Sequence, residues 1–63
     1  MRYMELMRRI NLTDLELAAK MCVGRMTAYR WNRARVVPTL YMRRALARLG
    51  GVKPDDVTWE RTR

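Results

Sequence analysis

Five large side chains in the stretch RMTAYRWNR can present hydrogen-bond donors and apolar surface on one side of a helix. At about 100° per residue, the stretch places them within one arc of about 140°. They are Arg25, Met26, Tyr29, Arg30 and Arg33. The guanidinium group of arginine matches the O6 and N7 acceptors of guanine in the major groove of DNA, and an α-helix fits in that groove. The spacing therefore predicts a helix that contacts bases.

The opposite side of the same stretch is apolar. Ala28 and Trp31 lie there. Ala28 is small enough to let the preceding helix approach closely through Ala18, and Trp31 can anchor the far end. The sequence thus predicts a short helix that is held by its back and exposes its arginines.

The charge balance indicates a polyanionic partner. The chain of 63 residues has 14 basic and 6 acidic residues and a formal net charge of +8. No acidic residue lies between Glu16 and Asp55, although basic residues recur throughout that span. A nucleic-acid-binding surface explains such a run of one sign. Two alternatives stay open, namely an ordinary solvated face and an arginine content raised by the base composition of the genome.

An anionic membrane is another polyanion, and residues 1–10 (MRYMELMRRI) are basic and amphipathic. They lack the apolar region and the small-residue cleavage site of a signal peptide. No apolar run approaches the roughly 20 residues that are needed to span a bilayer. We therefore interpret residues 1–10 as the first helix of a bundle and expect no membrane partner.

Other kinds of site lack the residues that they need. The sequence has no histidine and one cysteine, Cys22, so neither a metal-ligand set nor an internal disulfide can be assembled. The acidic residues lie where helix caps and solvent-facing positions require them. We therefore expect no enzyme activity, no cofactor and no small-molecule ligand. Cys22 is interpreted as a small turn residue in a reducing compartment, with a redox switch as the alternative.

Start and stop signals predict one all-α domain, a small four-helix bundle over residues 1–63 with a short C-terminal tail. Thr13 and Glu16 form a capping box, and Thr39 caps the last helix. Apolar spacing places the helices at 2–10, 14–21, 25–33 and 40–49. Core residues expected on the first, second and fourth helices are Tyr3, Leu6, Met7, Ile10, Leu15, Ala18, Ala19, Met21, Met42, Ala45, Leu46 and Leu49.

The tail contains Lys-Pro-Asp-Asp at 53–56, which predicts a turn or one short helical turn. Val57 and Trp59 then alternate, as in a strand or a packing arm. Trp59 either covers the chain's own core or belongs to a dimer contact. We favour a contact of Trp59, with Val57, at the dimer or its edge, because so small a core gains from oligomerisation.

The segment LTDLELAAKMCVGRMTAYRWNRARVVP (12–38) resembles the helix-turn-helix of the phage repressor and Cro family, with its core at 13–33. The segment RWNRARVVPTLYMRRALARLG also resembles the lysogeny-establishment activators of lambdoid phages. The resemblance implies a lambda repressor-like DNA-binding domain. Two positions that usually hold glycine hold Cys22 and Ala34 here. The turn at the first position requires a positive φ, so cysteine is strained there by about 1 kcal/mol.

The resemblance also assigns residues. Base contacts fall on Arg25, Met26 and Arg30, with Tyr29 beside them. Backbone phosphate contacts fall on Thr13, Thr27, Arg33 and Arg35. Met26 either touches thymine methyl groups or packs against the turn.

The function implied is that of a Cro-like repressor. It would bind double-stranded DNA as a homodimer on an inverted repeat, in the cytoplasm of a bacterium or a phage-infected cell. Activation of transcription by contact with RNA polymerase stays open. A protein-binding module, such as a phage inhibitor of a host enzyme or an antitoxin, is the alternative. It would expose Leu, Ile or Phe where residues 25–33 carry arginine. RNA binding is a weaker alternative, because the aromatic residues are too scattered to form a stacking platform.

Overall fold

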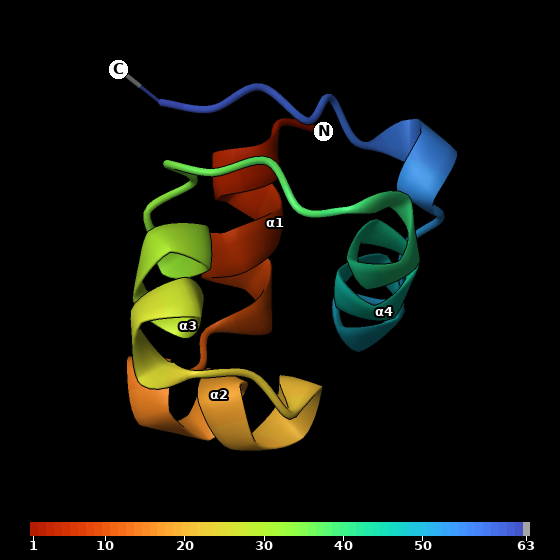
Figure 1. Ribbon diagram of the computed structural model, residues 1–63. Coiled ribbons are helices and arrows are strands. Elements are labelled where there is room, and N and C mark those ends of the chain that lie inside the picture. Colours follow the sequence, from red (N-terminus) through yellow and green to blue (C-terminus); the bar gives the residue numbers. More distant parts are fainter. Residues whose placement is uncertain (63) are drawn as a thin grey trace.

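The computed structural model describes residues 1–62, which fold into four α-helices and one short 3₁₀ turn. These are α1 (Tyr3–Ile10), α2 (Asp14–Met21), α3 (Arg25–Asn32), α4 (Leu40–Leu49) and η1 (Pro54–Asp56). The described part contains no strand, so the predicted all-α fold with four helices is confirmed. Figure 1 shows α3 and α4 on opposite sides of the molecule, with α2 across one end.

The helices begin and end at the predicted signals. The Thr13 side chain accepts a hydrogen bond from the Glu16 amide at 3.1 Å, and the Glu16 carboxylate accepts one from the Thr13 amide at 3.0 Å. These two bonds confirm the capping box. Thr39 caps α4. The predicted ends at residues 2 and 33 differ from the observed ones by one residue, because Arg2 and Arg33 are the flanking cap positions of their helices.

The core forms where the helices meet, and the residues of α2 that are buried in it differ from those predicted. Leu15 is 65% exposed and Ala19 is also exposed, so placing them in the core was wrong. Leu17 is fully buried in their place. Leu17, Ala18 and Met21 form a narrow inward stripe of α2, whereas Leu15 lies about 200° around the helix from Leu17.

On α4 the inward residues also differ in part from the prediction. Leu46 is fully buried as expected, and so is Ala47, which was not in the predicted set. Leu49 is 39% exposed in the last turn of the helix, so placing it in the core was wrong. Met42 and Ala45 are half-buried and pack against the core, as predicted.

The tail packs along the N-terminal end of α1. The Tyr3 amide donates to the Thr58 carbonyl at 3.0 Å, and the Thr58 amide donates to the Met1 carbonyl at 2.7 Å. Val57 is 6% exposed and belongs to the core. Trp59 is half-buried, and its indole nitrogen donates to the Pro54 carbonyl at 3.1 Å. The packing-arm interpretation is therefore the one that the structure supports.

Tyr3 connects three parts of the chain. Its side chain is fully buried, and its hydroxyl donates to the Val36 carbonyl in the loop after α3 at 2.9 Å. Its ring centroid lies 5.1 Å from that of Trp59, with the two planes tilted by 58°. Burial raises the pKa of the Tyr3 hydroxyl above its ordinary value, so the group stays a donor.

Replacing Cys22 by glycine should stabilise the protein. Cys22 has a left-handed backbone with φ 54° and ψ 45°, and its side chain is exposed. Glycine removes the contact between Cβ and backbone that disfavours this conformation, so Cys22→Gly should raise the free energy of unfolding by about 0.5–1 kcal/mol. Thermal melts monitored by circular dichroism would measure the change. Cys22→Ala is the control, because it keeps Cβ; a glycine variant no more stable than the alanine variant would contradict this account.

The capping box should make stability depend on pH. Hydrogen bonds from the Thr13 backbone and side chain lower the pKa of the Glu16 carboxyl below its ordinary value of 4.5. A lowered pKa stabilises the fold above pH 4.5, and this contribution is lost as the pH falls through the folded-state pKa. Glu16→Gln should therefore be less stable near pH 7, and the difference should shrink in acid. Urea unfolding of both proteins across this range is the measurement, and a difference that stayed constant with pH would show that the Glu16 charge contributes nothing.

Candidate nucleic-acid interface

The back of α3 is seated in the core. Ala28 is fully buried and Trp31 is 4% exposed, as the helical pattern predicted. α3 follows α2 after a short turn, in which the Val23 amide donates to the Ala18 carbonyl at 3.1 Å and Gly24 forms the extended cap. α3 packs more extensively on α2 than on any other element. Its orientation is therefore set by close backbone packing rather than by its own exposed residues.

A polar bridge joins the end of α3 to the beginning of α2. The Asn32 side-chain amide donates to the Asp14 carboxylate at 2.7 Å and to the Leu12 carbonyl at 3.2 Å. The other carboxylate oxygen of Asp14 lies 3.6 Å from an Arg33 nitrogen. We call this arrangement the Asn32 bridge. Asn32 was not among the residues predicted from the sequence. The available signal was a neutral amide directly after the buried Trp31, where a polar side chain needs a partner.

The front of α3 carries unpaired arginines. Arg25 and Arg30 are both exposed, and neither side chain makes an ion pair or a hydrogen bond within residues 1–62. Met26 is 59% exposed, so it does not pack closely against the turn. Tyr29 is half-buried between the front and the core. The structure thus brings together the four predicted base-contacting side chains on one exposed face.

The aromatic ring of Tyr29 organises the two arginines at the far end of that face. The Arg33 guanidinium lies 3.8 Å from the ring centroid, and that of Arg35 lies 5.8 Å from it. Both distances suit a cation–π interaction. Arg33 is also paired with Asp14, so part of its charge is already compensated. Arg35 has no acidic partner in the described residues and remains the less constrained cation of the two.

The other predicted phosphate contacts lie at helix beginnings. Thr13 caps α2 and is exposed, and Thr27 is half-buried in the first turn of α3. Amide groups in a first turn have no partner within their helix, so both positions lie beside donors that suit an anion. Figure 1 shows the N-terminal end of α3 next to α2, at the end of the molecule remote from both chain termini.

The loop after α3 contains another left-handed residue, besides Asn11 and Cys22. Ala34 has φ 53° and is fully buried. Its carbonyl accepts the Thr62 amide at 2.7 Å, so the tail holds this loop in place. Cys22 and Ala34 are the two positions where the phage repressor pattern usually has glycine, and both have the backbone conformation that favours glycine.

The described residues contain neither a cluster of metal ligands nor a membrane-spanning helix. No group of three or more potential metal ligands lies together in residues 1–62. No helix in this part of the chain combines the length and apolar character needed to cross a membrane. The arrangement on α3 is instead a set of cationic donors on a convex, rigidly held surface, and such a surface can bind an extended anion.

Comparison with known proteins adds no relative: no family model, no curated protein and no solved structure matched the chain.

Proposed function

We propose that the protein is a sequence-specific regulator that binds double-stranded DNA through α3. The observation that carries this proposal is the pair Arg25 and Arg30, both exposed and unpaired on a helix whose opposite side is buried. A helix held in this way can enter the major groove, where each arginine can donate two hydrogen bonds to one guanine. Met26 lies between them and is exposed enough to meet a thymine methyl group.

The backbone supports a helix-turn-helix interpretation of α2 and α3. A left-handed residue at the turn and another in the following loop are uncommon for residues with a Cβ. Here Cys22 and Ala34 have φ of 54° and 53°. They lie where the phage repressor pattern requires glycine geometry. The two departures from the pattern are departures in residue type, and the left-handed backbone at both positions supports the proposal.

The proposed phosphate contacts lie around the exposed face of α3. Thr13 and Thr27 lie at the beginnings of α2 and α3, and Arg35 lies in the loop beyond α3. Contacts of this kind hold a protein in register on the duplex without reading its sequence. Arg33 contributes less than Arg35 in this proposal, because Asp14 compensates part of its charge.

A homodimer on an inverted repeat is the proposed form, and occlusion of a promoter in the bacterial or phage-infected cytoplasm is the proposed mechanism. Because Val57 is 6% exposed, a partner would meet mainly the half-exposed Trp59. Half-sites would lie about one DNA turn apart, roughly 34–36 Å. The protein-binding alternative gains little from α3, whose front carries one exposed apolar residue, Met26, among arginines.

DNA affinity should fall steeply with salt. If a dimer neutralises about six to eight phosphates, the logarithm of the binding constant should change with the logarithm of salt concentration at a slope of about −5 to −7. Fluorescence anisotropy with a labelled duplex at several salt concentrations measures this slope. A slope shallower than about −2 would contradict DNA binding as the function.

Arginine substitutions should separate base reading from phosphate contact. Arg25→Ala or Arg30→Ala should cost about 1–3 kcal/mol on the preferred DNA and relax the preference for guanine at one position in each half-site. Arg35→Ala is the matched control in charge. It should weaken preferred and random DNA alike and reduce the salt slope by about one unit per site.

Competition against a library of randomised half-sites measures both effects at once. All three variants lose one positive charge, so a loss of affinity alone does not distinguish them. The decisive comparison is whether the preference for each base at each half-site position changes. If Arg25→Ala and Arg30→Ala lowered affinity without changing that preference, α3 would be a general cationic surface and the protein a non-specific DNA binder.

A further inference from the structure

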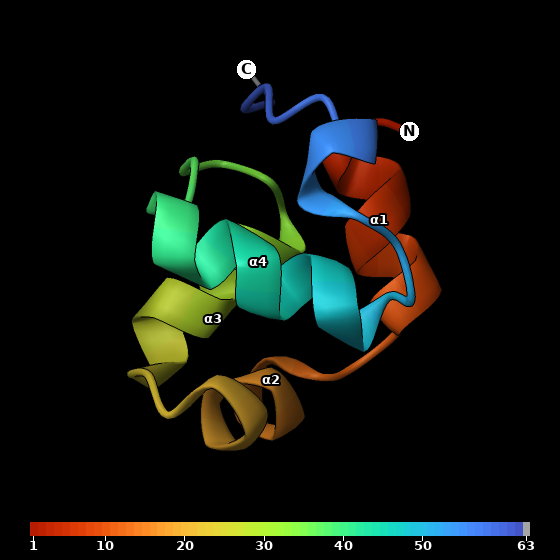
Figure 2. The same ribbon diagram turned by 90° about the vertical axis from the view of Figure 1, so that its right-hand side faces the viewer.

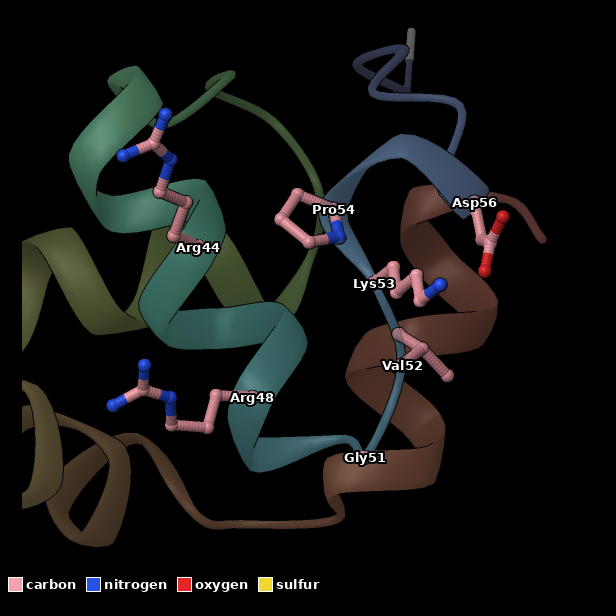
Figure 3. A pocket seen from close by; sticks show the side chains of 7 residues that line it. All are labelled: Arg44, Arg48, Gly51, Val52, Lys53, Pro54 and Asp56. Atoms are coloured by element: carbon pink, nitrogen blue, oxygen red, sulfur yellow. The ribbon is translucent and has the colours of Figure 1, made fainter.

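A second cationic surface lies on the side of the molecule away from α3. Between α4 and the segment around η1 there is an open hollow of about 770 Å³. Figure 3 shows the side chains that line it, which come from these two elements alone. They are Arg44, Arg48, Gly51, Val52, Lys53, Pro54 and Asp56. We call this hollow the α4 groove.

The α4 groove combines an apolar floor with a basic rim. Val52 and Pro54 are half-buried and form the floor. Arg44 and Arg48 lie one helical turn apart on α4, and Figure 3 shows their guanidinium groups extending over the exposed face of the helix. Neither guanidinium has an ion-pair partner within residues 1–62. Lys53 lies on the opposite wall, and Figure 3 shows its amino group directed away from α4.

The position of the groove excludes a role in binding the same duplex as α3. Figures 1 and 2 show α3 and α4 on opposite sides of the molecule, with α4 in front and α3 behind when the view is turned by 90°. A straight duplex seated on α3 would not reach the groove. The cations of α4 therefore remain available while α3 is occupied.

We propose that the α4 groove binds an acidic peptide segment of another protein, with an apolar side chain flanked by carboxylates. The apolar residue would lie on Val52 and Pro54, and the carboxylates would pair with Arg44 and Arg48. Arginine pairs with a carboxylate through two parallel hydrogen bonds.

A nucleic-acid backbone fits the groove less well. Phosphates need polar donors along an open surface, whereas the floor here is apolar. Asp56 also lies on the rim, and its carboxylate would repel a phosphate close to it. A peptide avoids Asp56, because its carboxylates can be confined to the side of α4 and its apolar residue can occupy the floor.

The test is a nuclear magnetic resonance titration of the isotope-labelled full chain with a synthetic peptide. In this peptide two leucines lie between pairs of glutamates, and no DNA is present. Amide chemical shifts should change at residues 44–56. Arg44→Glu combined with Arg48→Glu should weaken binding by at least about tenfold, because attraction becomes repulsion. Arg8→Glu combined with Lys20→Glu is the matched control, since both residues are exposed, lie outside the groove and give the same net charge. It should keep affinity within about twofold of the unchanged protein.

Two further measurements complete the test. Arg44→Gln combined with Arg48→Gln removes the charges with less risk to the fold, and it should also weaken binding. A peptide with serines in place of the leucines should bind weakly and should not shift the Val52 amide signal.

Equal losses of affinity in the groove pair and the control pair of variants would overturn the proposal, since net charge alone would then explain binding. So would shifts centred on α3. Because no DNA is used with the peptide, the result is independent of the proposed function.

Discussion

The fixed placement of α3 against α2 is the constraint on which the candidate interface depends. Ala28 has no exposed surface, and α3 packs more extensively on α2 than on any other element. The Asn32 bridge then ties the last residue of α3 to the beginning of α2 through hydrogen bonds of 2.7 and 3.2 Å. A helix of eight residues has little stability alone, and here tertiary contacts at both of its ends supply it. Its arginines are consequently displayed in one orientation.

The distribution of charge follows from the same packing. Asp14 is held by Asn32 and faces Arg33, which leaves Arg25, Arg30 and Arg35 without acidic partners in the described part of the chain. Tyr29 orders the cations at the end of α3, while α4 carries a separate basic surface above an apolar floor. The proposed DNA contact and the proposed peptide contact therefore use different sides of one small core. A domain of this size can connect a nucleic acid to a protein only if its two surfaces do not overlap.

Local signals in the sequence predicted most of the fold, and contacts between distant residues account for the rest. The capping box and the buried face of α3 depend on neighbours within a few residues, so spacing and residue type were sufficient. The left-handed Cys22 was implied by the resemblance to the phage repressor pattern. The choice of Leu15 over Leu17 failed because an eight-residue helix with leucines two positions apart has no single apolar direction until its neighbours are placed. The Asn32 bridge joins residues 18 apart in sequence, and the α4 groove exists only because the tail packs beside α4. Neither the Asn32 bridge nor the α4 groove produces a periodic pattern of residues in the sequence.

The most direct test of the central claim, that α3 presents the DNA-binding surface, is a nuclear magnetic resonance titration of the labelled protein with a DNA duplex of about two helical turns, long enough for two half-sites. The account predicts that amide and arginine side-chain signals change at the beginning of α2, along the front of α3 and at Arg35, while α4 and residues 52–56 stay unchanged. Changes concentrated on α4, or spread evenly over every arginine of the chain, would contradict it.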